Sequence, residues 1–233
     1  NLEKLIAKKK AIKKGAMQDL FTGKKRLPGF EGEWVQKSFY ELYEYASEGG
    51  TPSTRVPEYY SDGSIPFVKI EHLSKKYIYS VNSYISEQGL AHSSAWIIPV
   101  NSIIFSNGAT IGEVSINKIP VCTKQGILGI VPAHGVSFEF LYYYLSTDLF
   151  SRKVREVTTQ GTMSVVYLKD LKNISVFFPP SQDEQNAIAT ILSDMDCEIA
   201  GLEEKLSKYR NIKIGMMQTL LTGQIRLYNQ DTI

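Results

Sequence analysis

The chain has 233 residues, and 26 basic and 24 acidic side chains give it a formal net charge of +2 at pH 7. Its composition, 43% apolar and 21% charged, is that of a soluble folded protein of one or two domains. A near-neutral chain is not expected to hold nucleic acid by bulk charge alone. Its apolar runs are far shorter than the roughly 20 residues of a transmembrane helix, and no leader is recognisable, so we expect a cytoplasmic protein without a membrane segment.

The first predicted element is a helix over residues 2–22. Its apolar face is expected to contain Leu2, Leu5, Ile12 and Leu20. A glycine at position 23 follows the last apolar residues, as at many helix C-termini. Because the chain begins with Asn rather than Met, we expect it to have been processed or cut from something longer.

The small net charge hides an uneven distribution. Residues 1–27 carry nine basic and two acidic side chains, residues 28–180 carry 12 and 14, and residues 181–233 carry five and eight. The basic N-terminal run is either a solvated helix face or a surface for a polyanion, and both readings stay open. The middle segment gives no electrostatic indication of nucleic acid.

Residues 28–180 hold most of the aromatic side chains and have a sequence pattern typical of β-strands. Short apolar runs alternate with turn residues at 65–70, 77–81, 102–106, 111–116, 126–131 and 174–178. Residues 138–150 instead predict one helix, with leucines at a spacing of four. We therefore predict an α+β domain.

Four segments of this domain are rich in small polar residues: 49–55, 106–112, 123–126 and 158–164. Each alone is more typical of a turn than of a site. Together they offer hydroxyls, amides and isolated cations, the groups that contact phosphates and base edges. The candidate contact residues are Thr51, Ser53, Thr54, Arg55, Lys69, Ser106, Asn107, Thr110, Lys124, Gln125 and Thr162.

The last predicted element is a long helix over residues 182–222. Pro179-Pro180 interrupts the preceding segment, and Ser181 with Glu184 forms the S-x-x-E pattern of a capping box. Apolar residues then alternate at steps of four and three, which is a coiled-coil heptad pattern. They are Ile188, Leu192, Met195, Ile199, Leu202, Leu206 and Tyr209. A helix this long needs another helix as partner, and residues 2–22 are the obvious one.

An internal repeat links the two ends of the chain. Residues 2–27 and 202–227 are identical at 13 of 26 positions without a gap. Two copies of one helical element therefore bracket a single domain, as in half of a longer tandem array. By this symmetry, residues 202–227 lack their own partner, which predicts an exposed apolar stripe and a homodimer or swapped assembly.

Motifs for catalysis are missing from the sequence. There is no G-x-x-x-x-G-K-[ST] phosphate loop and no glycine-rich cofactor fingerprint. Cys122 and Cys197 are too few for a disulfide framework or a zinc site, and the three histidines show no ligand spacing. Phe177-Phe178-Pro179-Pro180 lacks the leading Asp or Asn of an amino-methyltransferase motif and is better explained as a helix-start breaker.

The ordered set of motifs resembles the specificity subunits of type I restriction-modification systems over essentially the whole chain. The set is GGTPST, YYSDGSIPFVKIEHL, SIIFSNGATIGEVSI, CTKQGILGIVP, FLYYYL and LKNISVFFPPSQDEQNAIATILSDMDCEI, followed by the helix that ends in LLTG. The resemblance implies one target recognition domain (residues 28–180), flanked by the end of a central spacer helix (1–27) and by a distal coiled-coil spacer (181–233).

The resemblance also implies a non-catalytic role. Such a domain would read one half of a bipartite DNA target through its loops, with Arg55 and Lys124 suited to guanine or phosphate and Asn107 and Gln125 to adenine edges. Modification subunits and a motor-nuclease subunit would be its partners and would hold S-adenosylmethionine, ATP and Mg²⁺; the chain itself would need no cofactor and no metal. Two alternatives remain: a coiled-coil protein scaffold, and a fragment of a stand-alone DNA methyltransferase or nuclease.

Overall fold

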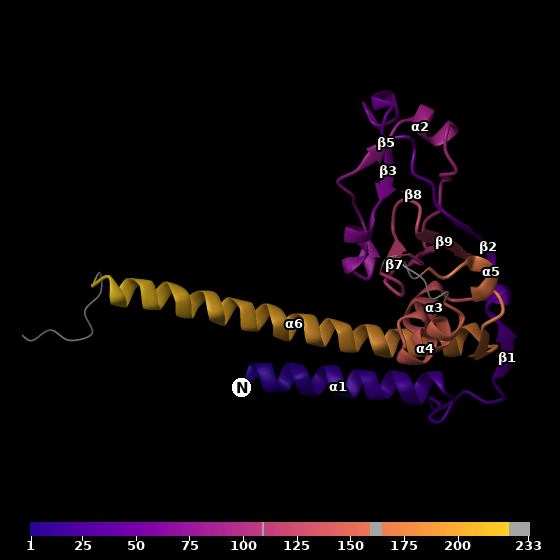
Figure 1. Cartoon of the computed structure of the whole chain (residues 1–233). Coiled ribbons are helices and arrows are strands. Elements are labelled where there is room, and N and C mark those ends of the chain that lie inside the picture. Colours follow the sequence, from indigo (N-terminus) through magenta and orange to yellow (C-terminus); the bar gives the residue numbers. More distant parts are fainter. Residues whose placement is uncertain (109, 159–164, 224–233) are drawn as a thin grey trace, which may run out of the picture. The chain divides into compact units, whose positions relative to one another are not determined.

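A computed structural model describes residues 1–108, 110–158 and 165–223. The chain divides into two compact units, a helical unit of Asn1–Ala16 with the residues from Ile191 onward, and a globular unit of Met17–Thr190. The first and last helices each contribute residues to both units (Figure 1).

The helices match the predicted ones at both ends of the chain. The α-helices are α1 (Leu2–Phe21), α2 (Glu87–Ala91), α3 (Phe138–Leu145), α4 (Asp148–Val157), α5 (Leu168–Leu171) and α6 (Gln182–Leu221). Short 3-10 helices are η1 (Phe39–Leu42), η2 (Pro57–Tyr59) and η3 (Ile70–Ser74). The strands are β1 (Val35–Ser38), β2 (Tyr43–Glu48), β3 (Ile65–Val68), β4 (Tyr77–Ile78), β5 (Tyr84–Ile85), β6 (Ile103–Ser106), β7 (Val114–Asn117), β8 (Cys122–Thr123), β9 (Ile127–Pro132) and β10 (Ser175–Phe178).

The strands form three small sheets in the globular unit. The largest has the order β2-β9-β6-β7-β4, in which β4 runs parallel to β7 and the other neighbours are antiparallel. A second sheet has the order β5-β3-β8, with β3 parallel to β8. The third pairs β1 with β10. With the helices, these sheets confirm the predicted α+β class.

Apolar clusters hold the sheets together. One cluster joins the five-stranded sheet to its neighbours and contains Val68, Leu73, Ile78, Ile98, Ile104, Val121 and Ile127, all buried. A smaller one lies in the three-stranded sheet around Phe67 and Cys122. Burial raises the pKa of the Cys122 thiol to about 12, so this cysteine is protonated at neutral pH.

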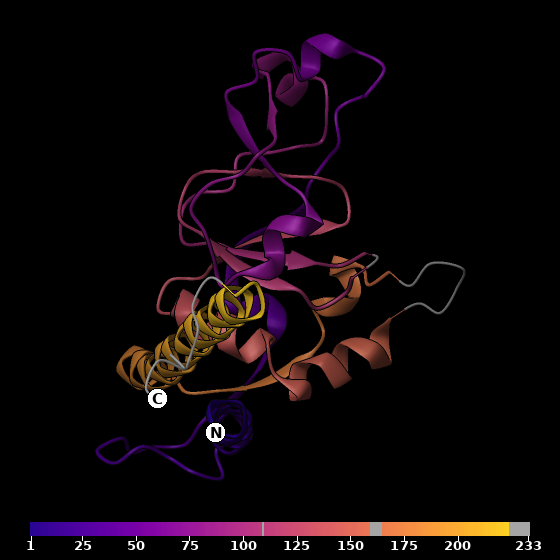
Figure 2. The same ribbon diagram turned by 90° about the vertical axis from the view of Figure 1, so that its left-hand side faces the viewer.

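Helices α3 and α4 lie on one side of the five-stranded sheet (Figure 2), and their aromatic side chains form a packed set there. Phe150 packs against Phe39, Phe105 and Tyr144, with ring centroids 5.6, 6.2 and 5.7 Å away. Phe21, from the last turn of α1, completes the set at 5.0 Å from Phe140. The end of α1 is therefore part of the globular core.

The prediction of one helix over residues 138–150 was wrong. The chain leaves the helix at Ser146, and the buried Thr147 starts a second helix by accepting a hydrogen bond from Phe150 N–H at 3.1 Å. A threonine ahead of an acidic first turn is a strong N-cap, and it outweighs the regular leucine spacing.

Residues 1–16 pack antiparallel to α6 in the helical unit. The ion pairs Lys13–Asp196, Lys9–Glu198, Lys10–Glu203 and Glu3–Arg210 run in opposite directions along the two helices, the last three at 2.6 Å each. Exposed pairs of this kind add little stability each, but together they define the register. The predicted pairing of α1 with α6 is confirmed.

In α6 the burial follows the predicted seam except at Tyr209, and in α1 it follows the prediction only in part. Ile188, Leu192 and Ile199 are buried, and Met195, Leu202 and Leu206 are half-buried, whereas Tyr209 is exposed. In α1, Leu20 is buried and Leu2 half-buried, but Leu5 and Ile12 are exposed. Ile6 is buried in their place, because the inner face of α1 follows Ile6, Lys9 and Lys13, whose lysines pair with carboxylates of α6.

The sequence repeat is also a structural repeat. Thr22 and Thr222 each donate a hydrogen bond to a glutamine carbonyl four residues earlier, at 2.7 and 2.6 Å. Gly23 and Gly223 follow with positive φ angles of 68° and 72°, which glycine adopts without strain. The two copies therefore end their helices in the same way.

The distal part of α6 carries the predicted exposed apolar stripe. Its exposed apolar side chains are Tyr209, Ile212, Ile214, Met216, Met217 and Leu221. Among the described helices, none combines the length and the unbroken apolar stretch that crossing a bilayer requires.

Candidate nucleic-acid interface

Three of the predicted loops meet at one edge of the five-stranded sheet. Strands β2 and β6 end at this edge, and β9 and β7 begin there, because the neighbours in the order β2-β9-β6-β7 run antiparallel. The first is residues 49–55 after β2, as predicted; the structure bounds the other two at 107–113 between β6 and β7 and 124–126 before β9, one residue off the predicted 106–112 and 123–126. We call this surface the loop edge.

Two hydrogen bonds hold the third loop against the end of β2 and the first loop. Gly126 N–H donates to Glu48 Oε1 at 2.7 Å, and Gln125 N–H donates to Thr51 Oγ1 at 3.3 Å. The chain is also very close at Gly49, where an added Cβ atom would overlap the carbonyl group of Thr123. Glycine at position 49 is therefore a steric requirement for this pairing.

Asn107 connects the second loop to two other segments. Its backbone N–H donates to the Gly126 carbonyl at 3.1 Å. Its side-chain Nδ2 donates to the Val166 carbonyl at 3.1 Å, and Val166 N–H donates back to the Asn107 carbonyl at 3.0 Å. The segment that leads into α5 is thereby fixed to the loop edge.

The structure corrects the roles predicted for Ser106 and Asn107. Both side chains are buried, with exposed fractions of 0% and 1%. Ser106 Oγ lies 3.2 Å from Thr110 Oγ1, inside the turn. The amide of Asn107 is directed at Val166 and not at solvent, so these residues position the loops and present no edge to a ligand. Asn107 Oδ1 has no hydrogen-bond partner among the described residues.

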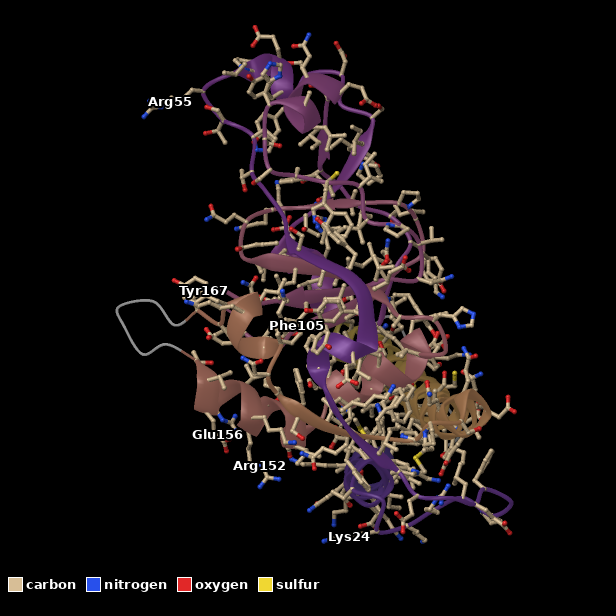
Figure 3. The ribbon with its side chains drawn as sticks, turned by 90° about the vertical axis from the view of Figure 1, so that its right-hand side faces the viewer. Lys24, Arg55, Phe105, Arg152, Glu156 and Tyr167 are labelled. Atoms are coloured by element: carbon tan, nitrogen blue, oxygen red, sulfur yellow. The ribbon has the colours of Figure 1, made fainter. Side chains whose placement is uncertain are left out.

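The other candidates at the loop edge are accessible. Thr51, Ser53, Thr54, Arg55, Thr110 and Gln125 are exposed, and Lys124 is half-buried. Arg55 extends away from the ribbon (Figure 3). Its loop is braced from behind, because Tyr60 donates its hydroxyl to the Pro52 carbonyl at 2.6 Å. Thr162 lies outside the described residues.

Lys69 joins Lys124 through the second sheet. Val68 and Thr123 are register partners in the parallel pair β3–β8, and the two lysines are the next residues along each strand. Lys124 N–H donates to the Val68 carbonyl at 3.1 Å, which fixes this adjacency. Neither ammonium group forms an ion pair with another residue of 1–108, 110–158 or 165–223. Two neighbouring cations without counter-ions are suited to an anionic ligand.

Within the described residues, no three His, Cys, Asp or Glu side chains are grouped so that they could hold a metal ion. The loop edge is a surface of hydroxyls, an amide and cations, which suits hydrogen bonding to a polar polymer.

Comparison with known proteins identifies the family. Residues 31–208 match the family model described as type I restriction modification DNA specificity domain. The chain belongs to this family. The resemblance inferred from the motifs is therefore confirmed.

Curated relatives of this specificity domain include proteins from Methanocaldococcus jannaschii and Escherichia coli. The chain is 34% identical over 167 residues to the type I restriction enzyme MjaIX specificity subunit of Methanocaldococcus jannaschii, which covers 70% of this chain and 38% of that protein. It is 26% identical over 182 residues to the EcoR124I/EcoR124II specificity subunit of Escherichia coli, covering 76% and 45%. The chain thus spans less than half the length of these relatives.

Solved structures share the fold of this specificity domain. The crystal structure of the HsdS subunit from Thermoanaerobacter tengcongensis aligns with a TM-score of 0.65 at 15% identity, over 96% of this chain and 53% of that one. The type I S subunit from M. genitalium aligns with a TM-score of 0.62 at 15% identity, over 94% and 56%.

The start of α6 anchors the specificity domain through Glu184, which the sequence marked only as part of a capping box, and through Gln185, which was not among the candidate site residues. Glu184 is 1% exposed and accepts hydrogen bonds from Arg26 at 3.0 and 2.7 Å and from Trp34 Nε1 at 3.1 Å. These bonds raise the pKa of the Arg26 guanidinium. The predicted capping box is therefore only half formed: Ser181 Oγ accepts from Glu184 N–H at 3.4 Å, while the carboxylate bonds to Arg26 and Trp34.

Gln185 is the second anchor, and it is fully buried. Its Oε1 accepts from Ser137 N–H at 2.7 Å, and its Nε2 donates to the carbonyls of Gly135 and Pro179 at 3.1 Å each. The sequence shows Glu184 and Gln185 shortly after Pro179-Pro180. Only the fold shows that both side chains are buried and hydrogen-bonded to other segments of the domain.

Proposed function

We propose that this chain is the sequence-reading component of a type I restriction-modification complex, which binds one half of a bipartite duplex DNA target. The observation that carries the proposal is the loop edge, where Thr51, Arg55, Thr110 and Gln125 are exposed together on a braced backbone. Family membership gives the reaction context, and the loop edge gives the surface that would do the reading.

The donors and acceptors of the loop edge are the kinds used for direct readout. An Arg side chain can donate two hydrogen bonds to guanine, and a Gln side chain can pair with the adenine edge. The backbone N–H of Gln125 donates to Thr51 Oγ1 at 3.3 Å. This bond fixes the backbone position from which the exposed side-chain amide of Gln125 extends. Lys69 and Lys124 would contact phosphates and so set the position of the duplex.

Catalysis would reside in other subunits. S-adenosylmethionine would bind to modification subunits that methylate a flipped base, and ATP and Mg²⁺ to a motor-nuclease subunit. Because residues 28–180 carry 12 basic and 14 acidic side chains, the chain alone should bind DNA weakly. Partners that close around the duplex would supply the remaining affinity.

Replacing Arg55 and Lys124 by alanine should change recognition in the assembled complex. We expect a loss of about 1–3 kcal/mol of discrimination at the guanine that Arg55 contacts, together with weaker binding at all sites from the loss of Lys124. Mapping of methylated sites after co-purification with a modification subunit measures the first effect, and band-shift assays measure the second.

Lys24→Ala with Lys25→Ala is the matched control, because both side chains are exposed in the globular unit and lie outside the loop edge. Unchanged affinity and unchanged target sites in the Arg55/Lys124 variant would reject these two assignments. Methyl transfer or cleavage by the purified chain alone would instead support the alternative of a stand-alone enzyme fragment. Failure to give a modification subunit any sequence preference would support the scaffold alternative.

The exposed stripe on α6 supports a second proposal, a homodimer. Residues 202–221 repeat the sequence of α1, whose own inner face is covered by α6, yet Ile212 and Met216 are 46% and 59% exposed. A second copy offers an identical stripe, and the two would pack across a two-fold axis.

Light scattering on the purified chain should therefore give twice the chain mass at high concentration. Met216→Lys should shift the molecule to a monomer, because it would place a charge in the apolar contact. Gln218→Lys introduces the same residue in the same turn on the other side of the helix and should leave the dimer intact. A wild-type chain that stays monomeric at high concentration contradicts the proposal.

A further inference from the structure

Within residues 28–180, the positive charge is concentrated in the segment that contains α4 and α5. Residues 148–173 carry five basic and three acidic side chains, whereas the remainder of residues 28–180 carries seven and 11. A segment with the opposite sign to the rest of its domain is a candidate for a polyanion contact, and no residue of this segment except Thr162 was among the predicted contacts.

Helix α4 presents this charge outward because its other face is anchored in the core. Phe150 and Val154, one turn apart, are 1% and 2% exposed. Arg152, Arg155 and Glu156 fall on the opposite side of the helix, and all three are exposed. The two arginines have no ion-pair or hydrogen-bond partner among the described residues, so their guanidinium groups are available to a ligand.

Helix α5 extends the same surface. Leu171 is buried, while Lys169 and Lys172 are exposed. Lys169 Nζ lies 5.3 Å from the centroid of the Tyr167 ring, which is itself 48% exposed. An aromatic ring beside cations is a common element of nucleic-acid contacts. Asp170 and Glu156 are the acidic side chains within this surface.

The surface is continuous with the loop edge. Val166, directly before Tyr167, exchanges two hydrogen bonds with Asn107 at 3.1 and 3.0 Å. Arg152, Glu156 and Tyr167 lie along one side of the globular unit, the side toward which Arg55 also extends (Figure 3). A duplex seated on the loop edge would therefore pass its phosphates along α4 and α5.

We propose that Arg152, Arg155, Lys169 and Lys172 form a phosphate-contacting surface that is separate from the base-reading loops. This second proposal rests on the proposed DNA function and assigns two parts of that function to two different surfaces. The loop edge discriminates sequences, and the α4–α5 surface binds the duplex backbone at any sequence. The ligand chemistry is that of a duplex polyphosphate, recognised through charge.

The test is the salt dependence of binding to a mixed-sequence 30-base-pair duplex, using the full chain. For Arg152→Ala with Arg155→Ala, we expect the slope of log K against log salt to decrease in magnitude by about 1.8, and the dissociation constant near 0.1 M salt to rise roughly 10- to 100-fold. Lys208→Glu is the control, since it lowers the net charge by the same amount at an exposed residue of α6 that belongs to the helical unit. Its slope should stay within error of wild type.

Three outcomes decide the inference. An unchanged slope in the arginine variant overturns it, and so does an equal loss in Lys208→Glu, which would indicate a diffuse charge effect. Absence of any duplex binding by the wild-type chain at low salt also overturns it. A parallel experiment selects duplexes that bind the assembled complex from a random-sequence library. If no sequence is enriched, the proposed function is refuted, even if the salt slope changes. If a sequence is enriched but the slope of the arginine variant is unchanged, only the α4–α5 surface is refuted.

Discussion

Gln185→Glu should lower the free energy of unfolding of the globular unit by about 3 kcal/mol, because a buried carboxylate would face two carbonyl oxygens. The native amide donates to Gly135 and Pro179 at 3.1 Å each, from a side chain with no exposed surface. The substitution keeps the shape of the side chain and removes both donated hydrogen bonds. Chemical denaturation of the full chain, followed by circular dichroism, measures the change.

The pH dependence of this variant gives an independent check. Burial beside carbonyls should raise the folded-state pKa of the introduced carboxyl group above its unfolded value of about 4.3. An acid with a raised folded pKa destabilises the protein as pH rises, so the deficit should be smaller at about pH 5 than at about pH 7. Asn186→Asp is the control, because it makes the same chemical change at the adjacent exposed position. An equal effect of both substitutions would contradict the role assigned to Gln185.

Gly49→Ala should abolish sequence preference while leaving the chain folded. Its Cβ would overlap the Thr123 carbonyl oxygen and lie 2.5 Å from the Thr123 carbonyl carbon, both backbone atoms that cannot move independently. The first and third loops must then separate, which breaks the contact between Gln125 N–H and Thr51 Oγ1. The cost in stability should be about 1–3 kcal/mol, as for other overpacked sites.

Target mapping in the assembled complex is the main readout for this variant, with denaturation as the second. Gly201→Ala adds the same methyl group in α6, where no atom lies within 4 Å, and should leave recognition unchanged. If Gly49→Ala retained wild-type specificity at full stability, the close pairing of these loops would have no part in recognition.

Local signals made the helix ends predictable. Gly23, Gly223 and the Pro179-Pro180 pair act over a few residues, and the structure places α1 and α6 within one residue of the predicted ends. The short strands were harder, because β1 and β2 carry polar and aromatic residues whose pairing with β10 and β9 is decided far along the chain. The break at Thr147 is hard to predict because the leucine spacing of four continues across it, whereas the cap that starts α4 is a single residue.

Candidate site residues were predictable as a group and less so one by one. The loops that converge at the loop edge were all recognised by their small polar residues. Composition could not distinguish Asn107, which is buried and holds Val166, from Gln125, which is exposed. The α1 seam failed for a similar reason: Lys9 and Lys13 face α6 through ion pairs, so the apolar residues Leu5 and Ile12 lie on the outer face.

The small sheet of β1 and β10 closes the segment between these two strands at its base. The antiparallel register runs from Val35 opposite Phe178 to Ser38 opposite Ser175. It therefore places the start and the end of the segment 39–174 side by side. The whole segment from η1 to α5 therefore begins and ends at this small sheet. A change in the length or surface of the segment above that closure would leave unchanged where the chain enters and leaves it, provided that the contacts of Phe21 and Gln185 with the segment are kept.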